Sequence, residues 1–239
     1  MTETRGPLWT RPAATKPERL TRETVVARAV ELADQEGLKA VSVRRIATEL
    51  SARPMSLYSF FERKEDLVDL MVDQVLGEML LDEMPPGDWR DALRAVLHRQ
   101  IEVGRRHPWV MSVFGERAPI GPQAARHAEQ SFQAIASLRL PPGQALKLLH
   151  VVDTYMWGFI TLSGQEQAAR QRDGLTEQEW RASTDAYFAE ITAGGELPHL
   201  AEAGRGGLLR GAAEDWKDDF DDGLRWLLDG FAHNLRPEG

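Results

Sequence analysis

Clusters of proline and glycine recur along this 239-residue chain, and their spacing constrains its fold more than any other feature. The clusters at 85–87, 119–122 and 141–143 divide it into segments whose apolar residues recur every three or four positions, as in an amphipathic helix. No window alternates polar and apolar residues over the length of a strand, so no sheet is predicted. The predicted fold is all-α, in a chain long enough for a small domain and a larger one.

Several protein classes are disfavoured by what the chain lacks. It contains no cysteine, which excludes disulfides, thiolate metal sites and a cysteine nucleophile. No apolar run approaches the roughly 20 residues that a membrane-spanning helix needs, and the N-terminus lacks the apolar stretch of a secretory signal. We therefore expect a soluble, cytoplasmic protein with no membrane partner.

Charge is distributed unevenly along the chain. The net charge of −8 disfavours nucleic acid as a partner, yet residues 1–64 hold 12 lysines and arginines against 8 acidic residues. The remainder holds 17 basic and 29 acidic residues. A basic N-terminal part on an acidic body is the asymmetry expected when only one end meets phosphate, although chance produces the same imbalance.

Four helices are predicted in the first third, after a proline-punctuated arm over residues 1–20. Thr21 caps a first helix that ends at Gly37, and Ser42 caps a short second one. Pro54 suits the first turn of a third helix, and a fourth begins near Lys64 and extends to about residue 81. Two short helices joined by a tight turn and braced by a longer one indicate a helix-turn-helix, which a plain helical bundle would mimic.

The rest of the chain predicts a helical body. A helix over about 144–170 is apolar nearly all round and must be buried on more than one side. A further helix is expected over 177–191, and a clean amphipathic stripe marks a last helix over 218–236. The segment 194–211 contains six glycines and is predicted to be a mobile loop.

Particular residues, beyond the helical pattern, carry a resemblance to a known family. The run SVRRIATELSARPMSLYSFFERKEDLVDLMVDQV resembles the DNA-binding region of the TetR family of repressors, above all in Leu57-Tyr58 followed by Lys64, an acidic residue and Leu67. The segments TYMWGFITLSGQEQ and DDFDDGLRWLLDGFAHNL are similar to the ligand-binding and dimerisation domain of the tetracycline-repressor subgroup. The family usually has glycine where this chain has Ser51, and serine tolerates left-handed geometry poorly, so the turn is either different here or strained.

The resemblance implies three parts: an arm over 1–20, a helix-turn-helix domain over 21–66, and a ligand-binding and dimerisation domain over 67–239. Side chains at the start of the recognition helix reach base edges, with Arg53 suited to guanine and Met55 to a thymine methyl, while Tyr58 and Lys64 match phosphate-contacting positions. Phe61 is predicted to be core, whereas Phe60 either faces the DNA or supports the helix. The predicted DNA-binding residues are Ser42, Arg44, Arg53, Pro54, Met55, Ser56, Tyr58, Ser59 and Lys64.

The N-terminal arm is a separate hypothesis. Arg5, Arg11, Lys16 and Arg19 lie in a segment that resembles the basic arms which enter a neighbouring minor groove. A solubilising tail would have the same composition. Deleting residues 1–18 separates the two, because only a DNA-contacting arm changes the affinity and its salt dependence.

No enzyme motif stands out, and a small-molecule pocket in the second domain is the better hypothesis. The histidines form no metal-binding pattern, no glycine-rich phosphate loop is present, and Val113 occupies the position at which the founding subgroup member has a metal-binding histidine. We therefore expect a largely apolar effector, no metal and no cofactor. Ordinary core is the competing explanation for each candidate. The predicted pocket residues are Trp109, Val113, Phe114, Phe132, His150, Asp153, Thr154 and Trp157, with Met111 and Met156 as further candidates.

The family mechanism implies a homodimer, formed by the helices over 144–170 and 218–236, that binds palindromic operator DNA and is released by a small molecule. The fourth helix is the expected lever because it touches both domains. Two alternatives stay open: an activator or a regulator that ligand does not release, and a helical ligand carrier or enzyme that has lost specific DNA binding.

Overall fold

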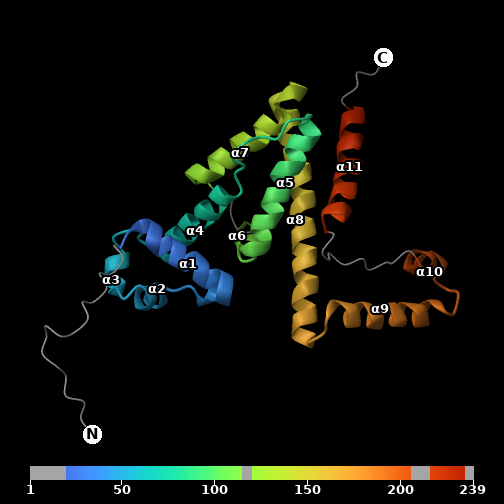
Figure 1. Ribbon diagram of the computed structural model, residues 1–239, viewed down its shortest axis with the longest axis horizontal. Coiled ribbons are helices and arrows are strands. Elements are labelled where there is room, and N and C mark those ends of the chain that lie inside the picture. The colour runs from blue at the N-terminus through green and yellow to red at the C-terminus, as the bar shows by residue number, and fades with distance from the viewer. Residues whose placement is uncertain (1–19, 115–119, 206–215, 235–239) are drawn as a thin grey trace, which may run out of the picture.

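The computed structural model describes residues 20–114, 120–205 and 216–234 (Figure 1). All regular structure within these ranges is helical, which confirms the predicted fold class. No helix in the described part of the chain is both long and apolar enough to cross a membrane. The arm residues Arg5, Arg11, Lys16 and Arg19 lie outside the described residues.

The N-terminal unit consists of α1 (Arg22–Glu36), α2 (Val43–Glu49) and α3 (Pro54–Leu57), with a short 3-10 turn over Leu38–Ala40. The predicted boundaries follow local chemistry. Thr21 caps α1 in a reciprocal pair with Thr24, Gly37 ends it with φ 82°, the Ser42 side chain accepts from the backbone N–H of Arg45, and Pro54 opens α3.

The turn between α2 and α3 has the strained geometry that the sequence allowed as one alternative. Ser51 adopts φ 52°, in the left-handed region that favours glycine. Regular helix in α3 ends at Leu57, and a turn carries the chain to Phe60. Phe61 is buried as predicted, and Phe60 is half-buried against the same core, so it supports the helix.

Helix α4 (Lys64–Glu78) joins the N-terminal unit to the body. It packs against α1 on one side and α7 (Pro122–Ile135) on the other. Its end comes earlier than the predicted residue 81, and the Arg99 guanidinium there donates to the Glu78 carbonyl over 2.7 Å. Side chains of α4 belong to a hydrophobic core that includes α1 to α3 and also Val103, Val110 and Ala124, so this core crosses from one part of the chain to the other.

The body is built around a second core formed by α5 (Trp89–Arg106), α7, α8 (Pro142–Asp173) and α11 (Trp216–Asn234), with α6 (Val110–Phe114) and a 3-10 turn over Ala136–Leu138 between them. Figure 1 shows α8 as a long column with α5 and α11 beside it. Leu148, Val152 and Met156 of α8 are buried together with Phe220 of α11. The buried residues of α8 form one face, whereas Leu146, Val151 and Leu162 are exposed, so the prediction of burial on more than one side is wrong for a single copy of the chain.

Two further helices follow α8 in the chain. Helix α9 (Glu177–Thr192) agrees with prediction, and α10 (Pro198–Arg205) packs against it (Figure 1). The predicted loop over 194–211 is therefore wrong for residues 198–205. Pro198 opens this helix and His199–Ala203 is free of glycine, so only the ends of the segment carry helix-breaking residues. Residues 206–211 lie outside the described part.

Candidate DNA-binding surface and effector cavity

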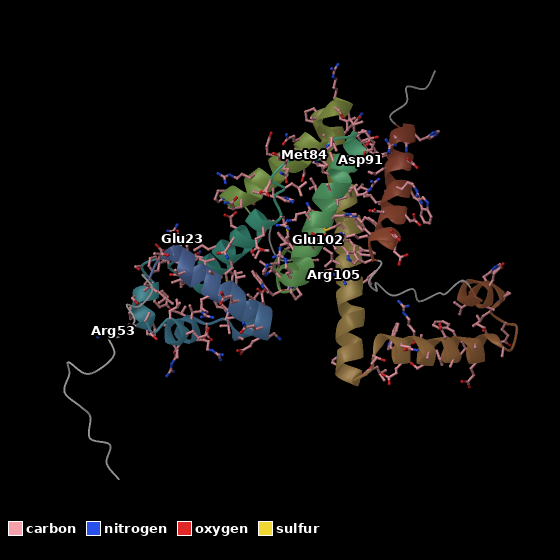
Figure 2. All side chains as sticks on the ribbon, viewed as in Figure 1. Glu23, Arg53, Met84, Asp91, Glu102 and Arg105 are labelled. Atoms are coloured by element: carbon pink, nitrogen blue, oxygen red, sulfur yellow. The ribbon has the colours of Figure 1, made fainter. Side chains whose placement is uncertain are left out.

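The predicted DNA-contacting residues lie together on the surface of the N-terminal unit and at the start of α4. Each of them is exposed, and none is needed to fill the core. Arg53 lies at the outer edge of this unit, far from α8 and α11 (Figure 2). The exposed set is Ser42, Arg44, Arg53, Pro54, Met55, Ser56, Tyr58, Ser59 and Lys64.

Helix α3 has one large apolar side chain exposed to solvent and another buried in the core. The Met55 side chain is 77% exposed, whereas Leu57 is fully buried. The Ser56 hydroxyl donates to the Arg53 carbonyl over 2.6 Å, and the Ser59 hydroxyl donates to the Ser56 carbonyl over 2.8 Å. Both hydroxyl oxygens therefore keep their acceptor capacity for groups that approach from outside.

Two adjacent arginines on α2 differ in what holds them. Arg45 is fixed by Glu36 at 2.7 Å and by Glu49 at 2.8 Å, and these carboxylates raise the pKa of its guanidinium. Arg44 forms no ion pair with any residue that the structure describes. Of the two, Arg44 is free to reach a phosphate without first breaking an ion pair.

At the start of α4, the Lys64 side chain is available to a phosphate, whereas the backbone N–H groups just before it are not. The Asp66 carboxylate accepts from the backbone N–H groups of Arg63, at 2.9 Å, and Glu62, at 3.1 Å. The bond from Arg63 is the main reason that the pKa of Asp66 lies below its ordinary value. A phosphate here would meet the exposed Lys64 ammonium, because the backbone donors that precede it are already used.

A cavity of about 260 Å³ lies inside the body, where four helices and the end of α4 converge. We call it the effector cavity. Most of its walls are apolar, with the Phe114 and Trp157 rings 4.7 Å apart between centroids. Its lining residues are Leu76, Met79, Gln100, Phe114, Ala124, His127, Ala128, Asp153, Met156 and Trp157.

The structure brings only some of the predicted pocket residues into this cavity. Phe114, Asp153 and Trp157 line it, as does the further candidate Met156. His150 and Thr154 are exposed, and the Thr154 hydroxyl donates to its own helix at the His150 carbonyl. Phe132 packs on the second core outside the lining, as does Met111, and Trp109 and Val113 belong to the first core.

Three polar side chains meet in the effector cavity. Asp153 comes from α8, and burial raises the pKa of its carboxyl to about 6. Gln100 of α5 is 2% exposed and its Nε2 lies 2.6 Å from His127 Nε2 of α7. Burial lowers the pKa of His127, so this imidazole is neutral and accepts from the amide. Among the described residues, no three side chains gather as metal ligands.

Gln100 and His127 were missed at the sequence level. Gln100 falls on the stripe of α5 that otherwise carries Leu93, Leu97 and Gly104, so a polar residue on an apolar face was the available signal. His127 carries no comparable signal, because its neighbours on α7 are mixed. Only the packing of α7 against α5 places its ring next to the amide.

A larger opening of about 510 Å³ lies between α4, α6 and the start of α7, with Val113 among its lining residues. Two of its carboxylates already have partners. Asp66 accepts backbone bonds in the turn before α4, and Asp73 accepts from the backbone N–H groups of Gln123 and Ala124. The smaller cavity is the better candidate for a ligand site, because its polar groups are less satisfied.

Helix α4 connects the two sites physically. Lys64 stands at its first residue, beside α3, while Leu76 and Met79 near its end line the effector cavity. Asp73, midway along it, caps the N-terminus of α7 at 2.9 Å from the Gln123 nitrogen. Helix α4 therefore extends from the DNA-binding surface to the effector cavity and contacts α7 between them.

A polar junction ties the N-terminal unit to the body. His107, after α5, faces Asp34 of α1 through Nδ1 at 2.8 Å and Glu78 of α4 through Nε2 at 3.3 Å. The Trp109 indole donates to the same Asp34 oxygen over 2.7 Å. The ring of His107 is buried while the two carboxylates are partly exposed, so the junction couples three elements in a partly buried site.

Comparison with known proteins agrees with this architecture. Residues 25–71 match the family "Bacterial regulatory proteins, tetR family", and residues 81–235 match "Tetracyclin repressor-like, C-terminal domain". The HTH-type transcriptional repressor DrrR1 of Streptomyces coeruleorubidus is 34% identical over 92% of this chain and 80% of its own length. An HTH-type transcriptional regulator of Saccharopolyspora erythraea is 31% identical over 95% of this chain and 92% of its own length.

Solved structures show the same fold. ActR of Streptomyces coelicolor in complex with actinorhodin superimposes with a TM-score of 0.76 and 25% identity, covering 92% of this chain and 99% of that one. The family matches span the helix-turn-helix and most of the body, and both relatives align over nearly the whole chain. The chain therefore belongs to the TetR family of bacterial regulatory proteins.

Proposed function

We propose that two copies of this chain bind a palindromic operator through their α3 helices and release it when a small molecule fills the effector cavity. The chain is a ligand-responsive, DNA-binding transcriptional repressor that acts in the cytoplasm, and it has no catalytic role. Residues 21–66 bind DNA, residues 67–239 bind the effector and the second copy, and the basic arm over 1–20 reaches the minor groove.

The observation that carries this proposal is the position of α4. Its first residue, Lys64, flanks the exposed surface of α3, and Leu76 and Met79 line the effector cavity. A ligand changes the DNA affinity only as far as it binds the two conformations of the dimer unequally. Helix α4 supplies the mechanical link, because its two ends belong to the two sites.

Dimerisation is supported by apolar side chains that one protomer leaves exposed. Trp226 of α11 is 73% exposed, and Leu146, Val151 and Leu162 of α8 are exposed as well. Large apolar side chains on neighbouring helices mark a surface that a partner covers. A two-fold dimer through α8 and α11 covers them and must hold its two α3 helices about 34 Å apart to enter successive major grooves.

The contacts divide into those that select sequence and those that position the protein. Arg53 forks onto guanine and Met55 contacts a thymine methyl, while the hydroxyls of Ser56 and Ser59 accept from amino groups on base edges. Tyr58, Lys64, Ser42 and Arg44 hold phosphates, and Pro54 fixes the entry of α3. The walls of the effector cavity are mostly apolar, which supports a largely apolar effector, and the complex of the related ActR with actinorhodin supports a small molecule as the effector.

Selection from a random duplex pool on the purified protein tests the proposal. A two-fold palindrome with half-sites one helical turn apart, or a multiple of it, is the expected result. Recovery of no motif, with binding at the non-specific level, would favour a ligand carrier that has lost DNA binding. A motif whose binding no compound weakens would favour an activator or a regulator that ligand does not release.

A further inference from the structure

We propose that the effector cavity selects a small aromatic molecule carrying a protonated amine, with Asp153 as the counter-ion and Gln100 as a second acceptor. This assignment rests on the proposed function, because it gives a chemical class to the ligand of the same cavity. It depends on neither the operator sequence nor the dimer.

Asp153 supplies a negative charge that has no ion-pair partner among the described residues. Its carboxylate lines the cavity, and it forms no hydrogen bond or ion pair with any residue that the structure describes. Burial raises its pKa to about 6, so at neutral pH the group is still mostly ionised. A partly buried, ionised carboxylate is stabilised most by a cation, and a ligand in the cavity can supply one.

The surroundings of Asp153 offer no competing positive charge. His150, one turn earlier on α8, lowers the pKa of Asp153 only as the lesser contribution, and its own side chain is exposed. His127, facing from α7, is kept neutral by burial. The described lining residues from α4, α5 and α6 carry no charge, and none of the lining residues that the structure describes is a lysine or arginine. An anionic ligand would therefore meet repulsion and no counter-ion.

Gln100 adds a second acceptor that requires a donor. Its Nε2 is committed to His127 at 2.6 Å, and its Oε1 is buried without a hydrogen-bond partner among the described residues. Leaving a buried carbonyl oxygen unpaired is costly, so a ligand that brings an N–H to it recovers a full hydrogen bond. Both unsatisfied groups of this cavity thus accept, and neither donates at neutral pH.

The aromatic requirement follows from the walls. Phe114 and Trp157 line the same cavity with ring centroids 4.7 Å apart, beside the thioethers of Met79 and Met156. Such walls favour a flat ring, and the faces of the two aromatic residues also attract a cation. The cavity therefore combines an apolar slot with an electron-rich polar end.

Two matched series test the proposal by isothermal titration calorimetry on the full-length protein without DNA. Each series places an amine, an alcohol and a carboxylate on one ring: benzylamine, benzyl alcohol and benzoate, then 2-naphthylmethylamine, 2-naphthylmethanol and 2-naphthoate. We expect an amine to bind at least about tenfold more tightly than its alcohol, and the carboxylate not at all. Asp153→Asn removes that preference, and Gln100→Leu weakens the amine about fivefold.

The control is Glu129→Gln on an exposed part of α7, which makes the same carboxyl-to-amide change outside the cavity and leaves the preference intact. The proposal is overturned if an alcohol or a carboxylate binds as tightly as its amine, if Asp153→Asn keeps the preference, or if neither amine binds up to millimolar concentration. Because no DNA is present, a failure to select an operator sequence would contradict the proposed function and leave this result unchanged.

Discussion

The DNA-binding surface and the effector cavity are built in opposite ways. The first lies on two short, capped helices and a turn, all within some twenty consecutive residues, and its functional side chains are exposed. The second assembles side chains from five helices, so that Met79 and Trp157 face one space from distant parts of the chain. Local rules specify the surface, whereas tertiary packing specifies the cavity, and α4 belongs to both.

The junction that joins the two regions gives the largest expected effect. His107→Ala leaves the carboxylates of Asp34 and Glu78 without their shared imidazole in a partly buried site, so the free energy of unfolding should fall by about 2 to 3 kcal/mol. Urea denaturation of the purified protein measures it. The exposed His199→Ala on α10 is the control and should change stability little. An unchanged midpoint for His107→Ala would show that the junction does not hold the two regions together.

Within the DNA-binding surface, Arg53→Ala should weaken binding of the selected duplex by about 2 kcal/mol and relax one base position. Lys64→Ala should weaken all sequences alike and lower the salt slope by about 1. Fluorescence anisotropy at several salt concentrations measures both effects. Arg126→Ala, an exposed arginine of the body, is the matched control. Equal losses on every duplex for Arg53→Ala would remove its role in reading sequence.

Within the cavity, Asp153→Asn should stabilise the unliganded protein, because it removes a charge from a partly buried position. The exposed charges of the DNA-binding surface have no comparable cost. Burial raises the pKa of Asp153 from 3.8 to about 6, so the folded protein retains a proton that the unfolded chain releases. The destabilising charge is absent near pH 4 and fully present above pH 6. The variant should thus exceed the wild type by roughly 1 to 2 kcal/mol at pH 7, and the gain should shrink as the pH falls.

Chemical denaturation of both proteins between pH 4 and pH 7.5 tests this difference. All other titratable groups are the same in both proteins, so the comparison isolates the contribution of Asp153. A gain that stays constant with pH would mean that Asp153 is not the titrating group.

The smallest expected effect is a change of stability at Ser51, in the turn between α2 and α3. Ser51→Gly relieves a non-glycine residue held at φ 52° and should stabilise the protein by up to about 1 kcal/mol, measured as a shift of Tm. The same change at Ser183, inside α9, should be destabilising by a similar amount because glycine is unfavourable within a helix. A loss of stability at both positions would show that the turn is not strained.

The contrast also explains what the sequence predicts and what it does not. Thr21, Gly37, Ser42 and Pro54 mark helix ends by their own chemistry, so the N-terminal unit follows from the residues at its boundaries. The glycine content of 194–211 led to a wrong prediction for 198–205, because the run from Pro198 to Ala203 carries no glycine and forms a helix. In the body, His150 and Asp153 occupy the same helix three residues apart, yet one is exposed and the other lines the cavity. That difference depends on which face α7 and α5 cover.

The coupling between the two regions through α4 is the central claim, and the distance between the two DNA-binding units of a dimer tests it most directly. Because the chain has no cysteine, Lys39→Cys gives one spin label per protomer on an exposed turn of the N-terminal unit. Pulsed electron paramagnetic resonance then measures the label separation in the free dimer, on the selected duplex, and with a compound that displaces the duplex. We expect a single narrow distance on DNA and a different one with the compound bound. A compound that binds in the cavity and displaces the duplex without changing the distance would contradict the account.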